Sequence, residues 1–324
     1  MTEVSYRQAI TQALADELEA DERVILFGED VAAAGGVFKA TEGLQERFGA
    51  ERVLDTPISE QAIVGCAIGA AIRGLNPVIE IMFADFAGVC FDQLANELPK
   101  YRYMTDGQVS VGLTVRLANG AGGGFGAQHS QSVENWFLSM IGLKIVTPAT
   151  PADAYALLRA SIRDPNPVLF FEHKNLYNTT GELEADVPAA IGKAAVAREG
   201  SDITLVASQL MRYRALEAAE LLAAEGVEAE VIDPRTMVPF DLETVGASLN
   251  RTNRLICVQE CPQGGSWGAN LVAALMAEQF ESFDAPPILV GGDETPIPYS
   301  GELEAAWLPS PERIADAARR TLAY

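Results

Sequence analysis

Apolar residues along the chain follow two alternating patterns, one with helical spacing and one of short unbroken runs. Helical spacing, flanked by capping residues and prolines, predicts helices at residues 5–18, 59–73, 86–98, 151–162, 211–225 and 311–322. Short apolar runs predict strands at residues 24–27, 53–55, 78–83, 109–117, 143–147, 168–172, 203–207, 229–232, 255–258 and 288–290. Strands that alternate with helices are typical of parallel sheets with helices on both faces.

The periodicity stops between residues 176 and 190, where LYNTTGELEADVPAA reads as a connecting segment. The alternation of strands and helices then resumes. We therefore predict two α/β domains, at residues 1–180 and 196–324, joined by a linker at residues 181–195.

Composition narrows the possible partners. Lysine and arginine number 23 against 45 acidic residues, a formal net charge of -22 that disfavours nucleic acid and anionic membranes and favours solubility. The sequence contains no run of 18 apolar residues, so no membrane span is predicted. The acidic, amphipathic N-terminal segment is unlike a signal peptide. The four cysteines have no zinc-ligand spacing, and a disulfide framework is not expected in a chain of this length. We therefore expect a cytoplasmic protein.

Two side chains are candidates for proton transfer. His129 lies in the glycine-rich segment GAGGGFGAQHSQS, directly after a predicted strand, where parallel sheets place their sites. Glu60 follows the predicted N-cap Ser59 in an otherwise apolar segment, where burial and the helix dipole act on its pKa in opposite directions. The other histidine, His173, is expected to be structural, and Arg116, the lone cation of its strand, could form a salt bridge.

A nicotinamide-dependent oxidoreductase is an alternative. Gly122, Gly124 and Ala127 match the spacing of the dinucleotide fingerprint. No clear helix starts at these glycines, however, and no acidic residue stands at the expected distance beyond them. The match is therefore weak.

Several longer motifs resemble one family and keep its order along nearly the whole chain. They are GEDV at residues 28–31, GGVFKATEGL from Gly35, DTPISE at residues 55–60, MFADFAGVCFDQ from Met82, KYRYM from Lys100, AQHSQS from Ala127 and RDPNPVLFFEHKNLY from Arg163. The family is the beta subunit of the thiamine-diphosphate-dependent decarboxylating component of 2-oxo acid dehydrogenase complexes. The resemblance implies a pyrimidine-binding domain of the thiamine-diphosphate-binding fold, followed by a transketolase C-terminal-like domain.

The resemblance also assigns roles to residues of the candidate site. Glu60 matches the glutamate that hydrogen-bonds the aminopyrimidine ring and so promotes loss of the proton from the thiazolium C2. Phe86 matches an aromatic residue packed on that ring, and Glu29 and Ile58 match residues that line the same pocket. His129 matches the histidine that assists acyl transfer to lipoamide.

A potassium site is a further implication of the resemblance. The matching residues are Leu113, Ser161, Ile162, Asp164 and Asn166. Oxygen ligands suit such a hard cation. A plain Asx turn in the DPNP segment is the alternative explanation of these residues.

The chain lacks the GDG segment that holds magnesium and the diphosphate in thiamine-diphosphate enzymes. We therefore expect an alpha subunit to supply that half of the site in an alpha2-beta2 heterotetramer, which would work with a lipoyl acyltransferase core. The expected reaction is oxidative decarboxylation of a 2-oxo acid and reductive acylation of lipoamide. Pyruvate is the leading substrate. Acetoin and branched-chain 2-oxo acid dehydrogenases are alternatives, as is a non-catalytic assembly protein of the same fold.

Overall fold

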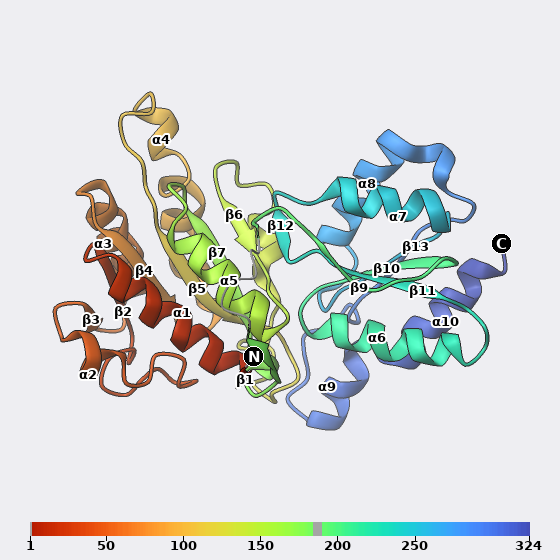
Figure 1. The fold of residues 1–324 in the computed structure, drawn as a ribbon, viewed down its shortest axis with the longest axis horizontal. Helices are drawn as coiled ribbons and strands as arrows, with labels where there is room; N and C mark the ends of the chain where they lie inside the picture. Colours follow the sequence, from red (N-terminus) through yellow and green to blue (C-terminus); the bar gives the residue numbers. More distant parts are fainter. Residues whose placement is uncertain (1, 184–189) are drawn as a thin grey trace. The chain divides into compact units, whose positions relative to one another are not determined.

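A computed structural model describes residues 2–183 and 190–324 of the chain (Figure 1). The backbone divides into two compact units, Met1–Asn119 with Trp136–Ile191 and Gly120–Asn135 with Gly192–Tyr324. The glycine-rich segment after the fifth strand thus groups with the second unit. The linker at residues 181–195 stays a prediction, and its residues 184–189 lie outside the described residues.

The first unit is built on a parallel sheet. Across that sheet the strands of the unit follow the order β6 (Lys144–Val146), β7 (Val168–His173), β5 (Thr114–Asn119), β4 (Asn76–Ile81), β2 (Val24–Gly28) and β3 (Val53–Asp55). Each neighbouring pair among them is parallel. Every residue of β5 and β7 is buried, as expected for strands covered on both faces.

Helices and short segments complete the first part of the chain. They are β1 (Thr2–Ser5), α1 (Tyr6–Ala20), α2 (Leu44–Phe48), α3 (Glu60–Ile72), η1 (Ala84–Gly88), η2 (Gln93–Glu97), α4 (Tyr101–Met104), η3 (Val133–Phe137), α5 (Pro151–Ile162), η4 (Lys174–Leu176) and β8 (Thr180–Leu183). The start of α1 is fixed by a capping box between Ser5 and Gln8. Thr150 caps α5, and Pro151 occupies its first position, as predicted.

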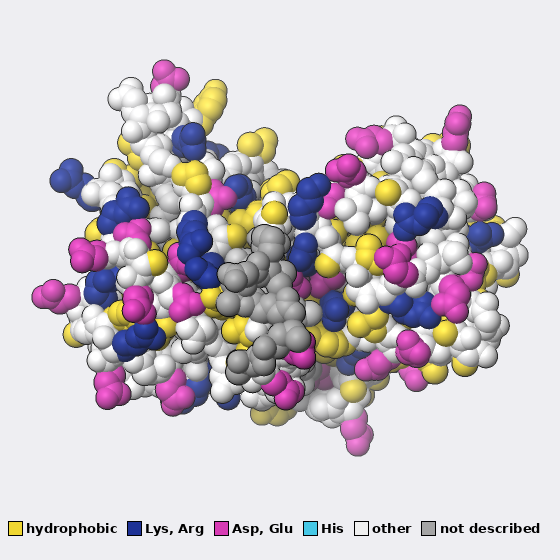
Figure 2. Space-filling model, viewed as in Figure 1, with side chains coloured by type: hydrophobic (Ala, Val, Ile, Leu, Met, Phe, Trp, Pro, Cys, Tyr) yellow, Lys and Arg dark blue, Asp and Glu magenta, His cyan; other side chains and the backbone are white. Residues whose placement is uncertain are grey.

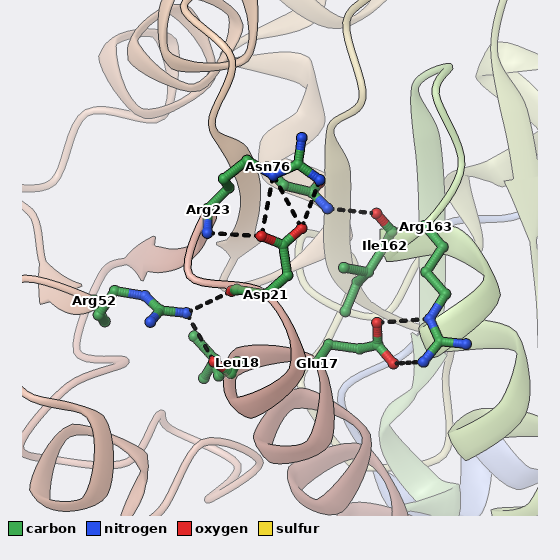
Figure 3. Close-up of polar contacts among 8 residues, drawn as sticks. All are labelled: Glu17, Leu18, Asp21, Arg23, Arg52, Asn76, Ile162 and Arg163. Atoms are coloured by element: carbon green, nitrogen blue, oxygen red, sulfur yellow. Dashed lines mark hydrogen bonds and ion pairs between the residues drawn. The ribbon is translucent and has the colours of Figure 1, made fainter.

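An acidic side chain joins α1 to α5, which lie side by side (Figures 1 and 3). Glu17 is buried and accepts two hydrogen bonds from Arg163, at 2.8 and 2.7 Å. Arg52 donates to the carbonyls of Leu18 and Asp21, both at 2.9 Å, and so satisfies the C-terminal end of α1. These contacts fix α1 against the sheet that it covers.

Several details differ from the prediction. The strand predicted at residues 109–117 begins only at Thr114, as β5. Residues 86–98 do not form one α-helix, because the 3-10 helix η1 and the π-helix η2 are separated by turns. The segment read as a linker from residue 176 contains β8, which pairs antiparallel with β1. Ser59 precedes α3 as predicted, but its side chain makes no capping hydrogen bond.

The second unit contains a mainly parallel sheet with the order β14 (Ile288–Val290), β13 (Leu255–Val258), β10 (Ile203–Ala207), β11 (Ala229–Asp233) and β9 (Ala195–Arg198). Only β9 pairs antiparallel within this sheet. The other elements are α6 (Leu210–Ala223), β12 (Thr236–Val238), α7 (Leu242–Thr252), α8 (Trp267–Gln279), η5 (Phe280–Ser282), α9 (Gly301–Trp307) and α10 (Pro311–Leu322). Figure 1 shows α6 and α10 on one face of the sheet and α7 and α8 on the other. The two predicted α/β folds with mainly parallel sheets are confirmed.

The surface carries its charge in a dispersed form. Figure 2 shows acidic side chains scattered over the visible face of each unit, with lysine and arginine side chains between them. Such mixing is typical of a surface that keeps a protein in solution. Across residues 2–183 and 190–324, none of the helices combines the length and apolarity needed to span a bilayer.

A buried ion cluster crosses the middle of the first sheet. Arg116 on β5 donates to Glu172 on β7 at 2.6 and 2.9 Å and to Glu80 on β4 at 2.6 Å. The Tyr177 hydroxyl donates to Glu172 at 2.8 Å. Burial raises the pKa of Glu80, and the charge of Arg116 opposes that rise. Arg116 is therefore the salt-bridge residue that the sequence allowed for.

Replacing Arg116 with methionine should destabilise the protein. Glu80 and Glu172 would remain buried without their cation, a defect that costs about 3–5 kcal/mol. Urea unfolding at pH 7 measures the loss, and mild acidification should recover part of it because protonated carboxyls carry no buried charge. The control is Arg23→Met, since Arg23 pairs with Asp21 at the surface. Equal unfolding midpoints for the two variants would contradict the prediction.

Candidate active site

The candidate site lies at the carboxyl edge of the first sheet. Glu29 directly follows β2, Glu60 begins the helix after β3, and Phe86 lies in η1 after β4. Because β2 pairs in parallel with both β3 and β4, these three segments leave the sheet at the same edge. That edge is where open α/β sheets bind ligands.

Two hydrogen bonds tie together the loops that carry the acidic residues. The Thr56 N–H donates to the carbonyl of Gly28 at 2.9 Å. The Asp55 carboxylate accepts from the N–H of Ala32 at 2.7 Å. The chain before Glu60 is thus fastened to the chain on either side of Glu29, which fixes the two loops relative to each other.

The two carboxyl groups are close enough to influence each other. Glu60 is half-buried at the first position of α3, and Glu29 is half-buried after β2. Burial raises the pKa of Glu29, and the charges of Asp30 and Glu60 raise it further. A carboxyl whose pKa is raised, with a second carboxyl beside it, is an arrangement that can hold and pass on a proton.

Cys90 lies near enough to Glu60 for the two groups to interact electrostatically. Its side chain is buried, and its thiol donates to the carbonyl of Phe86 at 3.6 Å. Burial, assisted by the charge of Glu60, raises the pKa of the thiol to about 12. The thiol is therefore neutral at physiological pH. The apolar stretches around Cys66 and Cys90 predict that both are buried small hydrophobes, which is confirmed for Cys90 and wrong for Cys66, which is exposed on α3. The position of Cys90 near Glu60 could not be predicted from composition.

The aromatic side chains form a connected row behind the site. Phe86 is half-buried and packs edge-to-face on Phe83, with ring centroids 5.7 Å apart. Phe83 packs in the same way on Phe38 at 5.7 Å. Phe38 in turn stacks on Tyr177 at 5.1 Å. The ring of Phe86 is thus supported by a row of three further aromatic rings. Ile58 lies in the turn before α3 with 75% of its surface exposed.

His129 belongs to the second unit. Its Nδ1 donates to the carbonyl of Gln128 at 2.5 Å, so in the neutral ring Nε2 is the nitrogen that can accept a proton. The segment that carries it is held by Glu304, whose carboxylate accepts from the N–H groups of Gly122 and Gly124 at 2.8 and 2.9 Å. These are glycines of the weak dinucleotide match. Their N–H groups bind the protein's own carboxylate, so the fingerprint does not indicate a nucleotide.

His173 is buried, and its Nδ1 accepts from the Asn175 N–H at 3.2 Å.

The residues matched to a potassium site lie close together at the end of α5 and before β7. The Asp164 carboxylate pairs with Lys144 and accepts the Asn166 N–H at 2.9 Å, which makes the Asx turn of the alternative interpretation. Burial opposes a low pKa at Asp164, but its hydrogen bonds from Lys144 and Asn166 hold the pKa below the usual range. The carbonyl of Ile162 accepts from Asn76 at 2.8 Å (Figure 3).

The remaining members of that set also present oxygens. The carbonyl of Leu113 accepts from the Val168 N–H at 2.9 Å, and that of Ser161 accepts from the Asp164 N–H at 3.1 Å. Carbonyl oxygens have a second lone pair, so these bonds leave them able to bind a cation. In the part of the chain that the structure describes, no three histidine, cysteine, aspartate or glutamate side chains gather as ligands for a metal ion.

Comparisons with known proteins agree with the fold and identify the family. Residues 2–180 match the family "Transketolase, pyrimidine binding domain", and residues 192–314 match "Transketolase, C-terminal domain". A solved "Split gene transketolase, inactive beta4 tetramer" aligns with a TM-score of 0.81 at 23% identity, over 99% of this chain and 98% of its own. That likeness supports the fold alone. Fold and family matches together define a transketolase-type protein with a pyrimidine-binding unit.

Curated relatives narrow the class. The "Acetoin:2,6-dichlorophenolindophenol oxidoreductase subunit beta" of Bacillus subtilis is 44% identical, over 96% of this chain and 95% of its own length. The "3-methyl-2-oxobutanoate dehydrogenase subunit beta" of Mycobacterium tuberculosis is 43% identical over 97% and 91%. The mitochondrial "Pyruvate dehydrogenase E1 component subunit beta" of Pisum sativum is 43% identical over 98% and 90%. The chain belongs to the family of beta subunits of thiamine-diphosphate-dependent 2-oxo acid and acetoin dehydrogenases, which are oxidoreductases.

Charge coupling between Glu29 and Glu60 can be tested directly. Glu60→Gln removes a negative charge beside Glu29, so the pKa of Glu29 should fall towards its ordinary value. A carbon-13 NMR titration of the Glu29 carboxyl measures the change. Glu51→Gln is the matched control, because Glu51 is exposed and precedes β3 at the opposite edge of the sheet. An unchanged pKa of Glu29 in Glu60→Gln would show that the two carboxyls are independent.

Proposed function

We propose that this chain is the beta subunit of a pyruvate dehydrogenase and that its first unit binds the pyrimidine ring of thiamine diphosphate. The observation that carries the proposal is the pair Glu29 and Glu60 at the carboxyl edge of the sheet, the edge at which the half-buried ring of Phe86 also lies. An aromatic face and a proton-holding carboxyl are the groups that an aminopyrimidine requires. The sequence identity to three kinds of beta subunit supports the same function.

Each residue of the site has a distinct task in this proposal. When bound, thiamine diphosphate supplies the electron sink for loss of carbon dioxide from the 2-oxo acid. Glu60 hydrogen-bonds the pyrimidine and relays a proton, and its charge helps to raise the pKa of Glu29 beside it. The side chain of Phe86 offers an apolar surface to the pyrimidine ring, and Phe83 packs against Phe86. The exposed Ile58 covers the ring from the side of the solvent.

The site is completed by a partner in this proposal. The chain contains no GDG segment, and its described residues hold no cluster of three metal-binding side chains. An alpha subunit would therefore supply magnesium and the diphosphate contacts, in an alpha2-beta2 heterotetramer that passes acyl groups to a lipoyl acyltransferase core. We place the assembly in the cytoplasm. The four free thiols support a reducing compartment, while the relative from pea is mitochondrial.

His129 acts in the second half-reaction, transfer of the acyl group to lipoamide. Its Nδ1 is committed to the carbonyl of Gln128, which orients Nε2 as the nitrogen for proton exchange. An imidazole suits protonation of a lipoyl sulfur as the carbon–sulfur bond forms. The role rests on the family resemblance and on the placement of His129 in the loop after β5.

The substrate could differ from pyruvate. The relatives include pyruvate, 3-methyl-2-oxobutanoate and acetoin enzymes at nearly equal identity. The segments FADFAGVCFDQ and EHKNLY lean mildly towards acetoin-cleaving enzymes, and AQHSQS fits pyruvate and acetoin enzymes alike, which makes acetoin the second candidate. Assays of the assembled enzyme with pyruvate, branched-chain 2-oxo acids and acetoin separate the three.

Glu60→Gln should nearly abolish turnover of the assembled enzyme while reducing cofactor binding only modestly. The amide can still hydrogen-bond the ring, but it cannot relay a proton. Exchange of the cofactor's C2 proton, followed by NMR after acid quenching, is the direct measurement. Glu51→Gln should exchange at the rate of the unmodified enzyme. If Glu60→Gln also does so, then Glu60 is not the activating residue.

We further propose that potassium binds the carbonyl oxygens of Leu113, Ser161 and Ile162 beside the turn at Asp164 and Asn166. Since Lys144 already balances the charge of Asp164, the ion would rest mainly on carbonyl dipoles. The melting temperature should therefore be higher in potassium chloride than in tetramethylammonium chloride at equal ionic strength. Identical melting temperatures in the two salts would leave the Asx turn as the full explanation of these residues.

A further inference from the structure

The side chain of a buried glutamate on α9 binds the backbone of the glycine-rich segment. Glu304 is only 2% exposed, and its Oε1 accepts from the Gly122 N–H at 2.8 Å while its Oε2 accepts from the Gly124 N–H at 2.9 Å. Both glycines have positive φ angles, +97° and +72°. Successive N–H groups in such a conformation form a concave site for an anion. Here that anion is the side chain of the protein itself.

A carboxylate is the side chain that fits this site. Each of its two oxygens accepts one N–H, and both bonds are charge-assisted, which makes them stronger than neutral hydrogen bonds. A glutamine at the same position offers one acceptor oxygen and turns an N–H group towards the second donor. The contact therefore depends on the charge and on the second oxygen of Glu304.

A second carboxylate closes the same loop at its base. Glu260 is buried, and its Oε2 accepts from the Ala121 N–H at 3.1 Å and from the Ser132 hydroxyl at 2.9 Å. These two contacts lie on either side of His129 in the chain. Glu304 bonds to the part of the loop between Ala121 and His129. Glu260 bonds to both ends of the loop and so brings them together.

The loop needs such restraints because of its composition. Gly120, Gly122, Gly124 and Gly126 all have positive φ angles. Glycine loses more conformational freedom on ordering than any other residue, so a loop of this kind samples many shapes unless it is fixed. A histidine carried by a loose loop would spend little time in a reactive position.

We propose that Glu304 is a positioning residue that orders the glycine-rich loop and thereby places His129 for acyl transfer. The second half of the proposal rests on the function proposed above for His129. The first half concerns only the order of the loop and can be measured without any activity. Glu304 touches neither substrate nor cofactor in this proposal and acts through the backbone alone.

The first test is amide hydrogen exchange of the whole chain with Glu304→Gln. Exchange at Gly122 and Gly124, resolved by NMR, should be about 10- to 100-fold faster, as expected for loss of charge-assisted hydrogen bonds. Glu302→Gln is the matched control, because Glu302 is exposed on the same helix and should change nothing. If the Glu304 variant does not fold, the unmodified chain still decides, because Gly122 and Gly124 should exchange more slowly than Gly123. Equal rates at the three glycines, or equal rates in the two variants, would overturn the proposal.

The second test compares two assays of the assembled enzyme. Glu304→Gln should lower the lipoamide-coupled rate at least tenfold, whereas decarboxylation with an artificial electron acceptor should change less than twofold. In a His129→Ala background, which itself costs about 10²–10⁴-fold in the coupled assay, the additional loss from Glu304→Gln should vanish, because the two residues act as a unit.

The outcomes separate the two halves of the proposal. Equal losses in both assays, or additive losses in the double variant, would refute positioning of His129. If the coupled assay shows no activity with any substrate in the unmodified enzyme, the function proposed for the chain fails. The exchange result would then still decide whether Glu304 orders the loop.

Discussion

One guanidinium group at the centre of the first sheet links β4, the strand that precedes Phe86 of the candidate site, to β5 and β7. Arg116 on β5 bonds to Glu80 on β4 and to Glu172 on β7, and all three side chains are buried. The position of β4 then constrains β2. A side chain at Gly28 would place its Cβ 2.8 Å from the carbonyl of Glu80, so only glycine allows the two strands to lie this close. The spacing of the loops that leave these strands follows from that approach.

Charge in the middle of a sheet does more to select a register than to add stability. Apolar side chains of similar volume often replace a buried ion cluster without loss of stability. An arginine bonded to carboxylates on both neighbouring strands is satisfied in one register only, however, since a shift by one residue moves every side chain to the other face. The carboxyl ends of these parallel strands are thereby aligned. Phe86 follows β4, and Glu29 follows β2, which pairs with β4. We infer that the ion cluster secures alignment of the site.

Local signals in the sequence predicted most of the elements, and contacts distant in sequence explain most of the failures. Helix α5 has its predicted ends because Pro151 and the cap at Thr150 are local features. Residues 86–98 were wrongly predicted as one helix, because apolar spacing does not separate 3-10, α and π hydrogen bonding. The local surroundings of Glu60 and His129 singled out these two residues, and the family motifs added Glu29; the roles of all three stay predictions. The contact between Gly122 and Glu304 spans 182 residues, and no local pattern indicates it.

The glycine-rich segment has a consequence for how this protein can be divided. Ala121 is part of the hydrophobic core of the second unit, although it precedes the start of that unit's sheet by more than seventy residues. A C-terminal fragment cut at the linker would therefore lack part of its own core and leave Glu260 and Glu304 without their backbone donors. The two units are not independent modules that recombination could exchange at a single junction. Shuffling between relatives would have to carry the crossover segment together with the C-terminal half.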